Sequence, residues 1–250
     1  MNIVVCVKNV PDSETRIKIL SDGVSIDESM IKFDTNPHDE YALEAAAQLK
    51  EKLGGEVTAI CLGDDNVTST IKRCLACGAD NAIHLVAQNS RMADSLVVAQ
   101  ALADEIKNIS FDIILCGKQV SDTDSHQVGG LIAQILDVPC ISMVNEISVS
   151  DKNVTASRDV EGAKEILECS LPCVLTAEKG LNKPRYPSLR DIMKAKKKEI
   201  KRKEIMLNQG GIEILSMEYP PPRNAGKIVG EGPEAVSELI KLLKEEAKVL

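Results

Sequence analysis

One stretch of the chain combines residue types that occur in phosphate-binding sites. Residues 117–131 read GKQVSDTDSHQVGGL and contain four consecutive turn-forming or helix-capping residues, Asp122, Thr123, Asp124 and Ser125. Such residues begin helices, and the free N–H groups at the N-terminus of a helix bind phosphate oxygens. Gly129 and Gly130 follow, and glycine lets the backbone approach a ligand closely. An ordinary capped helix with small packing residues explains the same composition, so the composition leaves both interpretations open.

Three other places lie where a predicted strand ends or a predicted helix begins. They are Cys6 and Val7 after the first strand, Asn36, Pro37, His38 and Asp39 at the start of a helix, and Leu62 and Gly63 after the second strand. In open α/β sheets, ligands bind beyond the carboxyl ends of the strands. We therefore expect these places and residues 117–131 to meet around one nucleotide site.

No catalytic constellation is predicted. The sequence lacks a GxSxG elbow, an HExxH motif, a Walker loop and a GxGxxG loop. The three histidines, His38, His84 and His126, are scattered, and we interpret His84 as structural because it lies in a predicted strand. Cys74 and Cys77 form a single CxxC inside a helical pattern, which favours two thiols on a helix face over a metal or redox site.

The composition argues against nucleic-acid binding. The net charge is −8 and aromatic residues make up 2%, whereas nucleic-acid sites need an excess of Lys and Arg or aromatic side chains for stacking. The basic run from Lys194 to Lys203 is interrupted by Glu199, which favours a solvated helix or a patch that attracts an acidic protein partner. No apolar run of 18 residues occurs and the sequence opens directly on a strand, so we expect a cytoplasmic protein without membrane insertion.

Strands and helices alternate over the first two-thirds of the chain. Continuous apolar runs predict strands at 2–7, 57–62, 82–86 and 111–116, and apolar periodicity predicts helices at 37–53, 67–75, 92–107 and 125–136. The helix at 37–53 is the best marked, with Asn36 as its cap, Pro37 in its first position and Gly54-Gly55 at its end. This alternation predicts a doubly wound, mostly parallel, Rossmann-like α/β sheet. After Pro139 two strand-like runs follow, at 147–156 and 166–177.

Residues 181–250 are expected to form an arm beside a core of residues 1–180. The arm begins with a loop held by two prolines, continues into a basic helix at 192–204 and ends in a helix at 233–248. It has so little apolar surface that it would be poorly stabilised alone. We expect it to pack on a partner subunit.

These stretches together resemble the β subunit of electron transfer flavoproteins. The resemblance runs from VVCVKNVPD through NPHDEYALEAAAQLKEK and GKQVSDTDSHQVGG to LNKPRYPSLRDIMKAKKK, nearly the first 200 residues. Its most specific part is ASRDVEGAKEIL, residues 156–167, where Arg158, Glu161, Gly162 and Glu165 match the family signature and Ala163 departs from it. The resemblance implies a heterodimer that carries electrons and has no bond-making catalysis of its own.

The resemblance also implies a cofactor arrangement. An FAD would be shared between the subunits and held mainly by the α subunit, while the β subunit would hold AMP, or a second FAD in electron-bifurcating relatives. The family's nucleotide site falls on Cys6, Asn36, Pro37, His38, Asp39, Leu62, Asp122, Thr123, Asp124, Ser125, His126, Gln127, Val128, Gly129, Gly130, Leu131, Ile132 and Ala133. The segment from Glu14 to Ile19 looks more like the non-bifurcating members, which favours AMP.

Two partner contacts are implied in the same way. Asp159, beside Arg158, would face the flavin domain of the α subunit. The recognition loop that docks on acyl-CoA dehydrogenases would run from Arg185 to Lys194, with Tyr186 in it and Leu189 as its apolar anchor. The alternative for Leu189 is that it packs under its own loop.

Proteins of two other classes share this strand order. A nucleotide-binding module of the universal-stress type would explain the first 140 residues, but neither the PRYPSL loop nor the arm. An adenylating hydrolase needs a glycine-rich phosphate loop after the first strand, and KNVPDS lacks those glycines. The electron donor, the acceptor and the choice between AMP and a second FAD are left open by the sequence.

Overall fold

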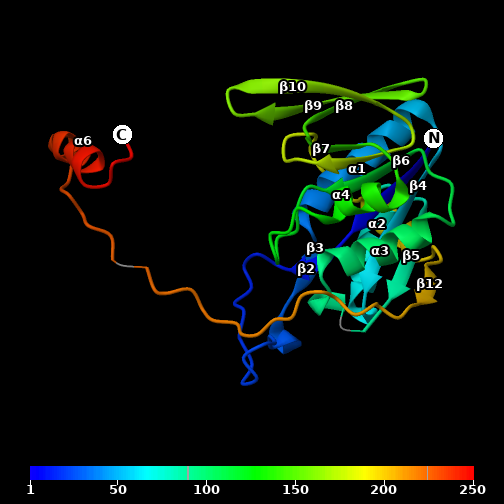
Figure 1. The fold of residues 1–250 in the computed structure, drawn as a ribbon, viewed down its shortest axis with the longest axis horizontal. Helices are drawn as coiled ribbons and strands as arrows, with labels where there is room; N and C mark the ends of the chain where they lie inside the picture. Colours follow the sequence, from blue (N-terminus) through cyan, green and yellow to red (C-terminus); the bar gives the residue numbers. More distant parts are fainter. Residues whose placement is uncertain (89, 224) are drawn as a thin grey trace. The chain divides into compact units, whose positions relative to one another are not determined.

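The computed structural model describes residues 1–88, 90–223 and 225–250 (Figure 1). In this part of the chain a seven-stranded sheet has the order β12-β5-β4-β1-β6-β11-β7. Its strands are β1 (Asn2–Val7), β4 (Glu56–Gly63), β5 (Asn81–Val86), β6 (Ile113–Gly117), β7 (Cys140–Val144), β11 (Cys173–Ala177) and β12 (Lys201–Glu204). All its pairings are parallel, which confirms the predicted doubly wound sheet.

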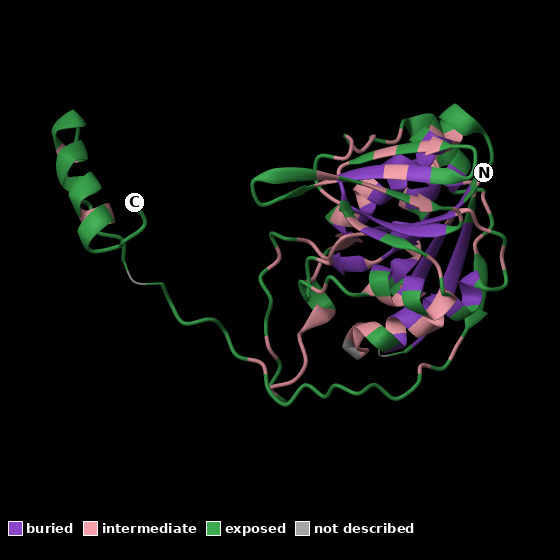
Figure 2. Cartoon of the chain, turned by 45° about the horizontal axis from the view of Figure 1, so that its top comes forward, coloured by how far each residue is buried: buried purple, intermediate pink, exposed green. Residues whose placement is uncertain are grey.

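Helices cover both faces of this sheet. The core on one face contains residues of α1 (Pro37–Leu53) and α2 (Thr68–Ala76), and the core on the other face contains residues of α3 (Ser95–Ile106) and α4 (Val128–Leu136). Alternate residues of β1 enter the two cores, because successive side chains of a strand point to opposite faces. This explains the unbroken apolar run at the start of the chain, and Figure 2 shows the burial of the sheet between its helices.

The order of winding reverses at β1. The chain adds β4 and β5 on one side of β1 and then returns to place β6 on its other side. Such a switch point opens a crevice at the carboxyl ends of the two central strands, because the loops that follow them diverge to opposite sides.

Helix α1 has the predicted bounds, and Asn36 is its N-cap residue as predicted. Pro37 stands in its first turn, Asp39 and Glu40 follow, and Gly54 ends it with a φ of 74°. The side chain of Asn36 makes no capping bond. It donates to the carbonyl oxygen of Gln119 at 2.8 Å and accepts from the N–H of Ser121 at 3.2 Å, so the prediction of an Asn36 side-chain cap is wrong.

The two strand-like runs after Pro139 each contain a break. They form β8 (Glu146–Ser150), β9 (Asn153–Val160), β10 (Ala163–Ser170) and the central strand β11. The first three make an antiparallel sheet in the order β10-β9-β8. A short antiparallel pair, β2 (Asn9–Pro11) and β3 (Phe33–Thr35), follows β1.

The predicted basic helix at 192–204 is wrong. A short helix α5 (Leu189–Ala195) ends early, and β12 pairs with β5 at the edge of the sheet. Lys201 and Lys203 lie on one side of this strand and bind Glu105, a carboxylate that is 2% exposed, at 3.0 and 2.6 Å. This buried carboxylate favours a strand, because residues two apart share a face in a strand and not in a helix.

The chain divides into two compact units, Met1–Ser216 and Met217–Leu250. The second contains a short 3-10 helix (Pro233–Ala235) and α6 (Val236–Glu245), on which Val236, Leu239 and Ile240 are exposed. The predicted boundary at residue 180 divides a nucleotide-binding core from an arm that packs on a partner subunit. This division stays a prediction.

Candidate functional site

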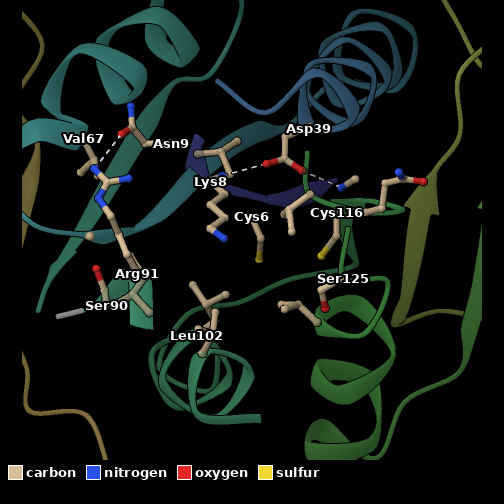
Figure 3. A pocket seen from close by; sticks show the side chains of 18 of the residues that line it. Cys6, Lys8, Asn9, Asp39, Val67, Ser90, Arg91, Leu102, Cys116 and Ser125 are labelled. Carbon is tan, nitrogen blue, oxygen red and sulfur yellow. Dashed lines mark hydrogen bonds between the residues drawn. The ribbon is translucent and has the colours of Figure 1, made fainter. Parts of the chain in front are cut away.

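A cavity lies at the switch point between β1 and β6 (Figure 3). The space between its walls is about 770 Å³, counting the part that opens to solvent. Its lining comes from the ends of β1, β4 and β6 and from the residues that follow β5. The structure therefore brings the predicted strand ends together around one cavity.

The cavity has an apolar part and a polar part. The apolar wall includes Cys6, Leu62, Val67, Val98, Leu102, Cys116 and Val128. The polar lining includes Lys8, Asn9, Asp64, Ser90, Arg91, Lys118, Gln119 and Ser125. In Figure 3 the thiols of Cys6 and Cys116 extend from the ends of β1 and β6 toward the side of the cavity where Leu102 stands on α3. Such a cavity suits a ligand that has an apolar part and a polar part.

Asp39 joins the two central strand ends. Its carboxylate accepts hydrogen bonds from the backbone N–H of Lys8 at 2.7 Å and of Gly117 at 3.0 Å. Burial raises the pKa of this carboxyl from its ordinary 3.8 to about 7, against the opposing effect of these N–H donors. Gly117 is needed for the close approach, because an added Cβ would lie 2.8 Å from the carbonyl carbon of His38. The first turn of α1 thus fixes the spacing of the cavity floor.

Each cation of the cavity lining has a carboxylate partner. Lys8 binds Asp122 at 2.7 Å, and Lys118 binds Glu178 at 2.5 Å. Arg91 lies 3.1 Å from Glu28 and stacks on Phe33, with its guanidinium carbon 3.9 Å from the ring centre. An incoming anion would therefore compete with carboxylates that already neutralise these cations.

The loop of residues 118–127 is held at both ends. Asn36 binds it at Gln119 and Ser121, and the hydroxyl of Ser125 lies 2.8 Å from that of Ser95 at the start of α3. Between these points Asp124 adopts a left-handed conformation with a φ of 51°. The loop leads directly into α4.

The N-terminus of α4 carries no side-chain cap. Gln127 is the residue before the helix, and its side chain makes no capping bond. The first N–H groups of a helix have no partner within the helix. Ser125 and Val128, at this end of α4, line the cavity. The helix therefore offers uncapped N–H groups near the cavity, which is where anions bind to helices.

Five of the predicted cofactor-binding residues line the cavity, namely Cys6, Asp39, Leu62, Ser125 and Val128. Asn36 supports the loop, and Asp122 binds Lys8 from it. Thr123, Asp124, His126 and Gln127 are exposed, whereas Ile132 and Ala133 are buried in the core. Direct contact of any of these residues with a ligand stays a prediction.

Pro37 and His38 precede Asp39 on α1 and do not belong to the cavity lining. Burial, followed by the charge of Lys118, lowers the pKa of His38. An added Cβ at Gly129 would lie 2.5 Å from Cγ2 of Thr176, so this glycine brings α4 close to β11. Gly130 and Leu131 line a separate, open groove with Gln127 and Ile212.

Several lining residues were not predicted from the sequence. Lys8 and Asn9 directly follow the first strand, and the rule that placed Cys6 there also covers them. Ser90 and Arg91 follow β5, another strand end to which the same rule applies. Val98 and Leu102 stand one turn apart on α3, and their place at the cavity follows only from the order of the strands.

The predicted partner-binding residues lie away from the cavity lining. Asp159 is exposed on β9, and Lys194 is exposed on α5. Tyr186 is 87% exposed and Leu189 is 84% exposed. The alternative that Leu189 packs under its own loop is therefore wrong for this chain. Arg185 binds Glu44 and Glu51 of α1.

Two kinds of feature are absent from the described residues. Residues 1–88, 90–223 and 225–250 contain no group of three His, Cys, Asp or Glu side chains placed to hold a metal ion. In the same part of the chain no helix has the length and apolar character needed to span a bilayer.

Comparison with known proteins identifies the family. A family model described as the electron transfer flavoprotein domain matches residues 24–206. The chain is 38% identical to the electron transfer flavoprotein subunit beta of Bacillus subtilis, with 100% of both chains covered. It is 35% identical to that of Syntrophomonas wolfei, covering 100% of this chain and 98% of the relative, and 34% identical to that of Bos taurus, covering 100% and 99%. The chain therefore belongs to the electron transfer flavoprotein family, among its β subunits.

Proposed function

We propose that this β subunit pairs with an α subunit and carries electrons from a flavin dehydrogenase, such as an acyl-CoA dehydrogenase, to an acceptor. The electrons pass through an FAD held mainly by the α subunit, and the cavity at the switch point binds AMP. The observation that supports nucleotide binding best is that the apolar wall of the cavity lies beside the uncapped N-terminus of α4. The FAD supplies the redox chemistry, and this chain supplies binding and position.

The cavity residues divide the work of holding AMP. The apolar wall between Leu102 and the thiols of Cys6 and Cys116 accommodates the adenine ring. The N-terminal N–H groups of α4 and the ammonium group of Lys8 hold the phosphate. Since Lys8 already binds Asp122, the phosphate has to displace this carboxylate or share the ammonium group of Lys8 with it.

A second FAD in the same cavity is the alternative. The cavity opens to solvent, so a longer dinucleotide could extend out of it. The subunit would then belong to the electron-bifurcating branch, which oxidises NADH. The two versions differ in the nucleotides bound to the purified heterodimer.

Acid release of nucleotides from the co-expressed heterodimer, followed by chromatography, tests the proposal. We expect one FAD and one AMP per heterodimer. Two FAD molecules, with bleaching of the flavin by NADH, would reject AMP in favour of the bifurcating version. A heterodimer with FAD alone would reject nucleotide binding by this chain.

A pair of variants links the AMP to the cavity. Val98→Glu places a carboxylate in the apolar wall, and we expect it to remove AMP and leave the FAD bound. Leu96→Glu is the matched control, because Leu96 is 56% exposed on the same helix and does not belong to the cavity lining. Equal AMP content in both variants would place the nucleotide elsewhere.

Docking on the dehydrogenase is tested through Leu189. Burial of one leucine contributes about 2 kcal/mol. Leu189→Ala should therefore raise the KM of the dehydrogenase for the heterodimer by about 30-fold. Leu215→Ala is the control, because Leu215 is 82% exposed and lies outside residues 185–194. An unchanged KM for Leu189→Ala would refute the docking role.

A further inference from the structure

Arg185 is bound to two carboxylates of helix α1 in its own subunit, and one of them is buried. Its Nε and Nη2 donate to the two carboxylate oxygens of Glu44 at 2.7 and 3.0 Å, and its backbone N–H donates to Glu44 at 3.2 Å. Its Nη1 and Nη2 donate to Glu51 at 2.5 and 3.2 Å. Glu44 is 5% exposed, and paired bonds of this kind fix both partners in one geometry.

Other bonds hold the chain on both sides of the segment 186–194. Before it, Asn182 donates through its side-chain amide to the carbonyl oxygen of Tyr41 at 2.8 Å. After it, Ala195 is 2% exposed, and Lys198 donates to the carbonyl oxygen of Ala79 at 2.8 Å. Within it, the hydroxyl of Ser188 accepts from the N–H of Asp191 and caps α5.

The apolar side chains between these fixed points face solvent. Tyr186 is 87% exposed, Leu189 is 84% exposed and Met193 is 56% exposed. Leu189 and Met193 are four residues apart on α5, so they lie on one face of the helix. The core does not hold these side chains, so the position of the segment depends on the bonds at its ends together with the packing of α5 against α2.

We propose that Glu44 and Arg185 form a positioning pair that pre-organises residues 186–194 for docking on the dehydrogenase. Arg185 then acts through its own subunit and not by contact with the partner. A segment that is already ordered loses less conformational entropy on binding, so the pair improves affinity without touching the partner. The inference rests on the proposed docking function.

Glu44→Gln separates this role from a direct contact. The amide offers one acceptor where the carboxylate offered two, so the paired bonds to Arg185 are lost. Because Glu44 is buried, the substitution removes no group that a partner could reach. We expect the KM of the dehydrogenase for the heterodimer to rise about tenfold while kcat stays unchanged. A tenfold rise corresponds to about 1.4 kcal/mol.

Hydrogen exchange of the heterodimer alone gives a second readout. We expect the backbone amides of residues 186–194 to exchange about tenfold faster in Glu44→Gln, whereas the amides of β1 stay unchanged. Arg185→Lys keeps the charge but loses the paired geometry, and it should show the same change if Glu44→Gln fails to fold. Glu51→Gln, which alters the carboxylate that is 56% exposed, should have a smaller effect.

The outcomes distinguish the two proposals. If Leu189→Ala raises the KM while Glu44→Gln and Arg185→Lys leave both the KM and the exchange unchanged, the positioning role is refuted and docking stands. If Leu189→Ala has no effect on the KM, docking itself fails. Faster exchange together with a raised KM in Glu44→Gln supports the positioning role. A raised KM in Arg185→Lys without faster exchange would show that Arg185 contacts the partner directly.

Discussion

Asp39 gives a direct test of how the cavity is held together. Its side chain is buried and accepts one backbone N–H from each of the two central strand ends, at Lys8 and Gly117. Burial raises its pKa from the ordinary 3.8 to about 7. The folded chain therefore keeps this proton between pH 4 and pH 7, whereas the unfolded chain loses it near pH 4.

The size of the effect follows from this difference. In that window the folded state binds one more proton than the unfolded state, so the free energy of unfolding falls by about 1.4 kcal/mol for each unit of rising pH. Between the ordinary pKa of 3.8 and the raised pKa of about 7 the loss adds up to about 4 kcal/mol. Above pH 7 the contribution stays constant, because the group is then ionised in both states.

Asp39→Asn removes this titration. The amide can accept only one of the two N–H groups, so at pH 4 the variant should be less stable than the wild type by about 1–3 kcal/mol. The difference in the free energy of unfolding between wild type and variant should shrink or change sign as pH rises from 4 to 7. Urea unfolding followed by circular dichroism at a series of pH values measures it, with Asp104→Asn, whose side chain is 57% exposed, as the control for net charge.

One result would refute the reasoning. If the stability curves of wild type and Asp39→Asn run parallel from pH 4 to pH 7, the folded carboxyl ionises at the same pH as the unfolded one. The two N–H bonds and the N-terminus of α1 would then offset burial completely. If the wild type gains stability relative to the variant as pH rises, the hydrogen bonds and the N-terminus of α1 outweigh the effect of burial on the pKa.

Two further predictions concern the glycines of α4 and the ion pair between Lys8 and Asp122. Gly129→Ala should destabilise the subunit by about 1–3 kcal/mol, because its Cβ meets the side chain of Thr176, whereas Gly130→Ala, with nothing within 4 Å of its Cβ, should stabilise it by up to about 1 kcal/mol. Thermal unfolding of the two variants checks this pair, and equal shifts would contradict the packing argument. Asp122→Asn frees Lys8 from its ion pair, so AMP should bind about 2–10-fold more tightly at low salt, as measured by calorimetry. Weaker binding would instead show that the ion pair holds the loop in its binding shape.

Much of the sheet could be predicted because its strands are buried on both faces. Residues 2–7 and 57–62 read as continuous apolar runs, and they lie between two cores. Helix α1 could be bounded closely, because Pro37 and Gly54 fix its ends by their own backbone preferences. In both cases the signal is local.

The rest depends on contacts between distant residues. The segment Lys201–Glu204 is charged throughout, and it becomes a strand because Glu105, far away in the sequence, binds two of its lysines. The place of Arg91 at the cavity depends in the same way on the strand order, which sets β5 two strands from β1. Side-chain chemistry at one position could not reveal either arrangement.

Helix α1 connects the cavity with the segment 186–194, which we propose for docking. It carries two buried carboxylates, Asp39 bound to the strand ends and Glu44 bound to Arg185. A shift of the helix along its axis would leave both without their donors, and each lost buried bond costs about 1–3 kcal/mol. The cavity floor and the proposed docking segment are therefore fixed by the same helix. A substitution that moves the helix should disturb both, whereas Glu44→Gln should disturb docking alone.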